Sequence, residues 1–152
     1  MKNLTALTLL LVLAACASLV RTRPTSPEDH AWVFLCYADQ TYDCKGIEPP
    51  QVVRNDSLNN MFGSLGFYFP GDDMVFIRTD LESREEEIGV LIHEIAHYLQ
   101  YQTRWSKGKH RCDVEQEAFR ISDKYYTKVG RLDLVRGPTW HESYPRCTPY
   151  EE

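Results

Sequence analysis

The sequence has no excess of positive charge, no internal repeat and no long apolar run beyond its first residues. Its 152 residues carry a formal net charge of −5. This acidic balance argues against a nucleic-acid partner, which needs a basic surface to neutralise phosphates. The length predicts one domain and excludes repeat solenoids, large barrels and most two-domain cofactor enzymes. The composition, 43% hydrophobic and 26% charged, excludes disordered and collagen-like classes.

The N-terminus carries the most apolar stretch of the chain. Lys2 is followed by an apolar run over residues 4–13 and then by the small residues Ala14 and Ala15. A positive start, a short apolar run and small residues are the parts of a secretory signal peptide. The run is too short for a membrane-spanning helix, which needs about 20 apolar residues. We therefore expect residues 1–15 to be a signal peptide.

Residues 13–16, Leu-Ala-Ala-Cys, resemble the lipobox of bacterial lipoproteins. The resemblance implies cleavage before Cys16 and attachment of a lipid to its sulfur, so that the membrane is a partner. Ala17 rather than Asp follows, which in that family is associated with the periplasmic face of the outer membrane. We expect a polar tether over residues 16–26 and one domain over residues 27–152. The alternative is a plain signal peptide that is cleaved later, without a lipid.

Four further cysteines are predicted to be structural. An even number of cysteines in an exported chain implies two disulfides. Three pairings are possible for Cys36, Cys44, Cys112 and Cys147, and we favour Cys36–Cys44 and Cys112–Cys147 because the first two are close in sequence. The chain lacks a C-x-x-C pair, which argues against a zinc site built from cysteines.

The pattern of apolar residues predicts an α+β fold. Ser26 followed by Pro27 is a helix start, and Pro70-Gly71 separates two β-prone runs as in a hairpin. Apolar residues at helical spacing follow a cap at Ser83. We expect an irregular tail from residue 131, strands at 51–54, 65–69 and 74–78, and helices over 27–40, 84–103 and 113–128.

The helix expected over residues 84–103 contains the sequence His93-Glu94-Ile95-Ala96-His97, an H-E-x-x-H motif. Residues four apart lie on one face of a helix, so His93 and His97 can bind one metal ion. Glu94 can then take a proton from a water that the metal activates and later deliver it to a leaving amine. The motif predicts a zinc site in which Glu94 is the general base and acid.

A catalytic zinc needs a third protein ligand. Residue 103 is Thr, where the metzincin pattern has His, so the ligand must come from elsewhere. With Glu115-Gln116-Glu117-Ala118-Phe119 on the next helix, the sequence resembles small bacterial gluzincin-like zinc metallopeptidases, in which a Glu on a later helix completes the site. The resemblance implies that Glu115 is the third ligand, that Ala118 allows close helix packing, and that the strand at 74–78 forms the edge of the cleft.

Glu117 is the alternative third ligand. It lies about 200° around the helix from Glu115, and the apolar residues of this helix place Glu115 nearer the buried side. Phe119 stands where those families carry Asp or Asn, so a hydrogen bond that would support the site is expected to be missing. The residue that stabilises an oxyanion is left open among Tyr125, Tyr126, His141, Tyr144 and Arg146.

These observations predict an exported, lipid-anchored zinc metallopeptidase that acts on a peptide or protein. One alternative is a protein of the same fold that binds zinc and a partner without catalysis. Another is a structural lipoprotein whose histidines bind no metal. The substrate and the oligomeric state are not predicted.

Overall fold

The structure is a computed structural model that describes residues 26–57, 64–137 and 147. The predicted signal peptide, the lipid-attachment residue Cys16 and the tether up to residue 25 lie outside the described residues. The described residues form an α+β fold with three α-helices and one three-stranded sheet. None of these helices has the length and apolar character needed to span a bilayer.

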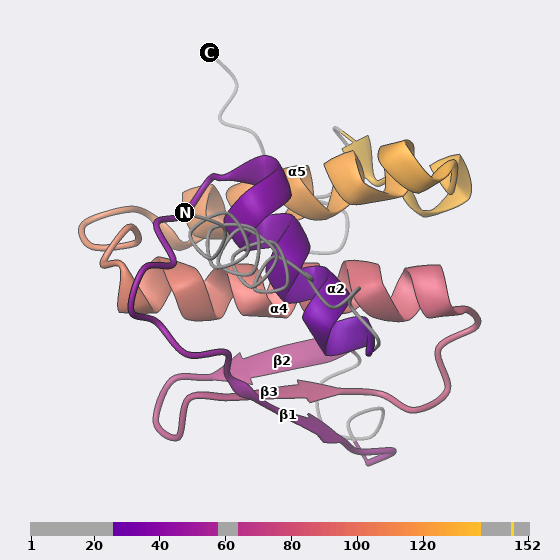
Figure 1. Cartoon of the computed structure of the whole chain (residues 1–152), viewed down its shortest axis with the longest axis horizontal. Helices are drawn as coiled ribbons and strands as arrows, with labels where there is room; N and C mark the ends of the chain where they lie inside the picture. The colour runs from indigo at the N-terminus through magenta and orange to yellow at the C-terminus, as the bar shows by residue number, and fades with distance from the viewer. Residues whose placement is uncertain (1–25, 58–63, 138–146, 148–152) are drawn as a thin grey trace, which may run out of the picture.

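Helix α4, Arg84–Gln102, is the centre of the fold. It lies between the sheet on one side and helix α5, Arg111–Val129, on the other, while α2, Pro27–Val33, crosses it (Figure 1). Because α4 has neighbours on several sides, most of its residues are buried. The core of the domain forms around its fully buried side chains Leu91, Ile92, Ile95 and Leu99.

The first helical segment begins where the sequence predicts, but its second half is a π-helix rather than an α-helix. The Ser26 side chain accepts from the backbone N–H of Asp29 at 3.0 Å, and Asp29 reaches back to the Ser26 N–H. The α-helix α2 then continues as a π-helix, η1, over Phe34–Asp39. The segment ends at Gln40, which has a φ of 55°, close to the predicted end.

The sheet contains the predicted hairpin of β2, Gly66–Phe69, and β3, Met74–Ile77, together with β1, Gln51–Arg54. The strand order is β1-β3-β2, with β1 parallel and β2 antiparallel to β3. The expectation that the strand at 74–78 forms the edge of the cleft is wrong, because β3 is paired on both sides. Among the described residues, β2 is the edge strand on the side of α4.

Both long helices have recognisable ends. The Ser83 side chain accepts from the Glu86 N–H at 3.2 Å at the start of α4. Helix α5 begins two residues before the predicted start, with the His110 side chain accepting from the Cys112 N–H, and it ends at Gly130, where φ is 78°. A short 3₁₀ turn, η2, follows over Leu132–Leu134, in a region predicted to be irregular.

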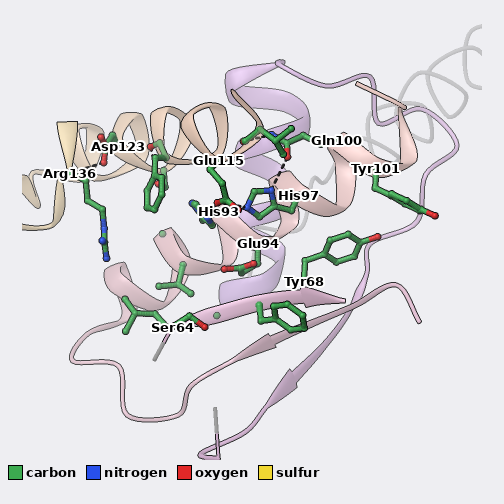
Figure 2. A pocket seen from close by; sticks show the side chains of 18 of the residues that line it. Ser64, Tyr68, His93, Glu94, His97, Gln100, Tyr101, Glu115, Asp123 and Arg136 are labelled. Atoms are coloured by element: carbon green, nitrogen blue, oxygen red, sulfur yellow. Dashed lines mark hydrogen bonds and ion pairs between the residues drawn. The ribbon is translucent and has the colours of Figure 1, made fainter. Parts of the chain in front are cut away.

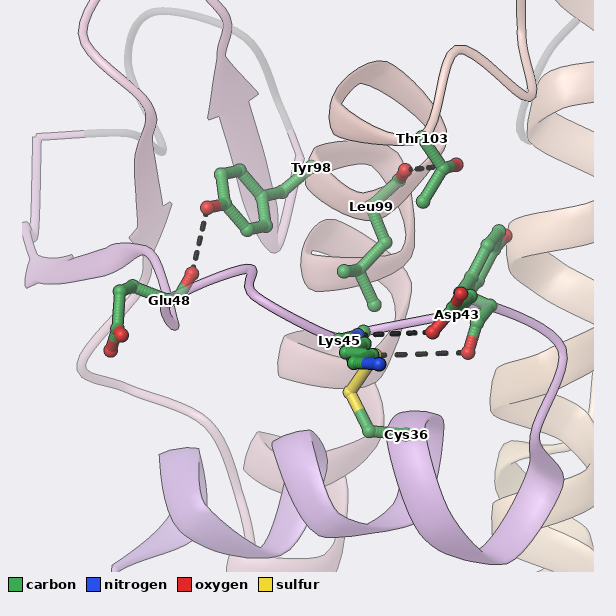
Figure 3. Close-up of a disulfide and its surroundings, with 9 residues drawn as sticks. Cys36, Asp43, Lys45, Glu48, Tyr98, Leu99 and Thr103 are labelled. Carbon is green, nitrogen blue, oxygen red and sulfur yellow. Dashed lines mark hydrogen bonds between the residues drawn. A yellow bond between two sulfur atoms is a disulfide. The ribbon is translucent and has the colours of Figure 1, made fainter.

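The structure pairs the four cysteines as the sequence analysis favours. Cys36 is joined to Cys44, and Cys112 is joined to Cys147. The loop after the first disulfide is held against α4, because the Tyr98 hydroxyl donates to the Glu48 carbonyl at 2.7 Å (Figure 3). Two disulfides are typical of proteins that mature in an oxidising compartment.

Candidate metal centre

Three predicted ligands from two helices come together beside the sheet. His93 and His97 lie one turn apart on α4, and Glu115 approaches from the first turns of α5 (Figure 2). The two Nε2 atoms are 3.2 Å apart, and the Glu115 Oε2 lies 3.4 Å from that of His93 and 3.2 Å from that of His97. The three residues form a group that can hold a metal ion.

The close packing of α5 on α4 brings Glu115 to the histidines. Ala118 is completely buried between the helices, and its methyl group leaves room for close contact. Gly89 on α4 has the same effect further along, because the ring of Tyr126 occupies the space where a side chain would lie. Glu115 is only 6% exposed, so its carboxylate is held among the histidine rings.

His97 is oriented by a hydrogen bond to Gln100. The His97 Nδ1 lies 2.8 Å from the Gln100 Oε1, and the Gln100 amide donates to the Val114 carbonyl at 3.0 Å. Since the amide nitrogen is used there, Oε1 faces the ring and Nδ1–H is the donor. The lone pair of a neutral His97 is then on Nε2, which faces His93 and Glu115. This is the support that metal-ligating histidines need.

His93 has no such support among the described residues. Its Nδ1 is buried without a hydrogen-bond partner there, and the Phe119 ring lies 4.3 Å from the imidazole, centroid to centroid. An Asp or Asn at residue 119 could accept a hydrogen bond, but Phe cannot. Phe119 therefore supplies no hydrogen bond to His93.

The charges of the group favour an ionised carboxylate. Burial acts to raise the pKa of Glu115, but hydrogen bonds from His93 and His97 outweigh it and hold the pKa well below its usual value. Burial acts to lower the pKa of His97, but the hydrogen bond and the charge of Glu115 raise it overall. Glu115 is therefore ionised at neutral pH, the form in which a carboxylate binds a metal.

Glu94 lies beside the three candidate ligands but belongs to the sheet side of α4. Its side chain packs against Gly66 of strand β2. Burial raises the pKa of Glu94, and the charges of His93 and His97 oppose this effect without cancelling it. A buried carboxyl group with a raised pKa, placed beside a candidate metal site, is suited to accept and return a proton.

A cleft with a volume of about 990 Å³ opens over the candidate ligands. Strand β2 forms one wall and α5 forms the other, so that Tyr68, Glu94 and Glu115 all line it (Figure 2). The exposed rings of Phe69 and Tyr101 also line the cleft. It can therefore accept an elongated ligand with apolar groups next to the candidate metal site.

Of the other candidates from the sequence, one lines the cleft and the rest do not or are not described. Glu117 forms an ion pair with Arg120 at 2.6 Å and does not line the cleft. Tyr126 lines the cleft, and its hydroxyl donates to the Glu86 carbonyl at 3.4 Å, whereas Tyr125 packs against Phe34. The remaining oxyanion candidates, His141, Tyr144 and Arg146, lie outside the described residues.

Two residues of the cleft were missed by the sequence analysis. Gln100 orients His97, and its position three residues further along the same helix could have indicated this contact. Arg136 lines the cleft from the segment after η2, and no local pattern announces it because the tertiary fold alone brings that segment to the site. Comparison of the chain with models of known protein families, with curated proteins and with solved structures finds no match.

Proposed function

We propose that the protein is a zinc-dependent metallopeptidase with His93, His97 and Glu115 as zinc ligands and Glu94 as general base and acid. The observation that carries the proposal is the triangle of ligand atoms with a buried carboxyl group beside it. Two histidines and one carboxylate are a ligand set used by catalytic zinc, which keeps a further position open.

The size of the triangle supports zinc. Bonds of about 2.0–2.1 Å in a tetrahedral arrangement place neighbouring ligand atoms about 3.3 Å apart. The three ligand atoms are separated by 3.2, 3.2 and 3.4 Å. This spacing fits one small ion held by all three side chains without a rearrangement of either helix.

Glu94 performs the proton transfers in this proposal. When bound, zinc supplies a Lewis acid that polarises the substrate carbonyl and lowers the pKa of a water molecule. Glu94 takes the proton of the attacking water and returns it to the nitrogen of the leaving amine, so the peptide bond breaks with no net loss of a proton. The Glu94 side chain lies against Gly66 in the wall of the cleft.

The edge of β2 favours an extended peptide as substrate. The Arg78 N–H donates to the Leu65 carbonyl at 3.0 Å, and bonded pairs alternate along an antiparallel ladder. Phe67 therefore bonds to β3, whereas the backbone groups of Gly66 and Tyr68 face the cleft. A peptide can pair with these groups as an added strand, with its apolar side chains against Phe69.

We also propose that the protein is exported and anchored by a lipid on Cys16, on the periplasmic side of the outer membrane. The signal-like N-terminus and the two disulfides support export. Metabolic labelling with a fatty acid tests the anchor: wild type should be labelled, and a Cys16→Ser variant should lose the label. If the wild-type protein is not labelled, it carries no lipid and the proposed anchor is wrong.

The proposed activity is tested on purified, disulfide-bonded protein. Wild type should bind about one equivalent of zinc and cleave peptides from a mixed library, as followed by mass spectrometry. Glu94→Gln should keep the zinc and lose cleavage by several orders of magnitude, because the amide cannot accept the proton. Glu117→Gln is the matched control, since it removes a carboxylate from α5 outside the cleft, and it should retain both properties.

Two results would contradict the proposal. A protein that binds less than about a tenth of an equivalent of zinc has no metal site of the expected strength. A protein that binds zinc but whose function in cells is unchanged by Glu94→Gln and lost with His93→Ala would be a binding factor of this fold rather than a peptidase.

A further inference from the structure

Arg136 is held at one end of the cleft by a carboxylate from α5. The Asp123 side chain accepts from the backbone N–H groups of Arg136 and Gly137 at 2.9 and 2.7 Å. Gly137 has a φ of 53°, a conformation that glycine adopts without strain. These contacts fix the chain after η2 against α5, so the position of the Arg136 backbone is set by the fold.

The Arg136 side chain runs from α5 toward the sheet, within the cleft (Figure 2). Its guanidinium carbon lies 5.3 Å from the centre of the Phe119 ring, and that ring lies 4.3 Å from the His93 ring. Phe119 therefore touches both the cation and a candidate zinc ligand. The two contacts limit the distance between the Arg136 guanidinium and the His93 ring to roughly 10 Å. An extended peptide covers this distance in about three residues.

Arg136 is one of the two arginines that line the cleft among the described residues. Arg111, the other arginine that lines the cleft, has its Nε 4.0 Å from the Glu115 carboxylate. The charge of Arg136 instead acts on the Tyr126 hydroxyl, where it opposes the rise in pKa that burial causes. The cleft thus has a metal-binding group at its centre and a cation at the end near Phe119.

We propose that Arg136 binds a carboxylate of the substrate, so that the protein prefers peptides with an acidic group within about three residues of the bond that is cleaved. This inference rests on the proposed peptidase function. An arginine fork matches the two oxygens of a carboxylate, and both an Asp or Glu side chain and a free C-terminus present that group. Phe119 restricts the guanidinium from one side.

The test measures peptide binding without cleavage. Zinc-loaded Glu94→Gln protein is titrated with fluorescent alanine-rich peptides that carry Glu at each position in turn, with matched Gln peptides, and with C-terminal acids and amides. At the best position Glu should bind about tenfold more tightly than Gln, the scale expected for a hydrogen bond to a charged group. If the peptides with a C-terminal amide instead bind less tightly than the matching C-terminal acids, the carboxylate that Arg136 binds is that of the C-terminus.

Variants at two arginines assign the effect. In the same Glu94→Gln background, Arg136→Gln should reduce the preference to about one, and Arg136→Glu should favour the neutral peptide. Arg120→Gln removes an equal charge from α5 outside the cleft and should leave the tenfold preference unchanged. The inference about Arg136 is overturned if the preference for acidic peptides survives Arg136→Gln. It is also overturned if zinc-loaded protein binds peptides without such a preference. Neither result contradicts the proposed peptidase function. Loss of zinc or of all peptide binding contradicts the proposed function as well.

Discussion

The side chain of Glu94 occupies the space into which a side chain at Gly66 would project. A methyl group on Gly66 would lie 2.7 Å from the Glu94 Cγ and 2.9 Å from a methyl group of Val90. The edge strand β2 and helix α4 therefore meet at the proposed catalytic carboxylate. The absence of a side chain at Gly66 allows Glu94 to lie directly against the strand.

Gly66→Ala is expected to reduce peptide cleavage by about 100-fold with little effect on zinc content, because a shift of about 1 Å in a catalytic group has this cost. The ligands lie on α4 and α5, away from the added methyl group. Gly71→Ala is the control in the same hairpin, since its methyl group would meet the exposed Phe69 ring. Full activity in Gly66→Ala would show that the contact does not position Glu94.

Glu115→Ala should reduce bound zinc to less than about a tenth of an equivalent, whereas Glu117→Ala should retain about one equivalent. The reason is geometric: the Glu115 carboxylate lies 3.2 Å from the His97 Nε2, and Glu117 is paired with Arg120. Metal analysis of the purified variants measures this. Loss of zinc from Glu117→Ala with retention in Glu115→Ala would reverse the assignment.

Phe119→Asp is expected to raise the affinity for zinc by about 10- to 100-fold, the range over which hydrogen-bonded partners of metal ligands act. The new carboxylate can accept the proton of the His93 Nδ1, which is buried without a partner among the described residues. Competition with a chelator measures the affinity. Phe119→Leu removes the ring without adding an acceptor, so an equal gain in both variants would contradict this explanation.

Gly89→Ala should destabilise the protein by about 1–3 kcal/mol, the usual cost of overpacking a filled core. The new methyl group would lie 2.1 Å from the Tyr126 ring. Alanine is otherwise the better helix former, by about 1 kcal/mol, so the sign of the change is diagnostic. Chemical denaturation should show that the same substitution becomes stabilising in a Tyr126→Ala background. Destabilisation of equal size in both backgrounds would argue against a clash.

Removal of the Cys112–Cys147 disulfide should destabilise the protein more than removal of Cys36–Cys44. The two bonds close loops with sequence separations of 35 and 8 residues. Chain entropy assigns them about 4 and about 2.5 kcal/mol, respectively. Paired Cys→Ser variants and unfolding in denaturant test the order. The reverse order would mean that native contacts around Cys36, rather than loop length, dominate.

Local patterns predicted most of the helices because their signals are short in range. The cap at Ser83 and the apolar spacing that follows define α4 within a few residues of its observed bounds. The π-helical half of the first segment was not predicted, since the same buried side chains suit an α- or a π-helix. The two differ in which backbone groups bond.

The order of the strands could not be predicted from the hairpin. Turn residues identify β2 and β3 as partners, but they do not say on which side of the pair a third strand is added. The parallel pairing of β1 with β3 makes β3 central and leaves β2 as the edge strand beside Glu94. That pairing joins segments with about 20 residues between them, so no local signal determines it.

The sequence by itself determined that His93 and His97 share one helix face and that Glu94 stands beside them, because helical periodicity depends only on spacing. It also favoured Glu115 over Glu117 as the third ligand, because the apolar residues of the next helix place Glu115 nearer its buried side. Only the tertiary structure brought Glu115 within 3.2 Å of His97, placed the Phe119 ring 4.3 Å from the His93 ring, and carried Arg136 into the cleft. These relationships depend on the packing of α5 against α4 and of the following segment against α5, which joins residues distant in sequence.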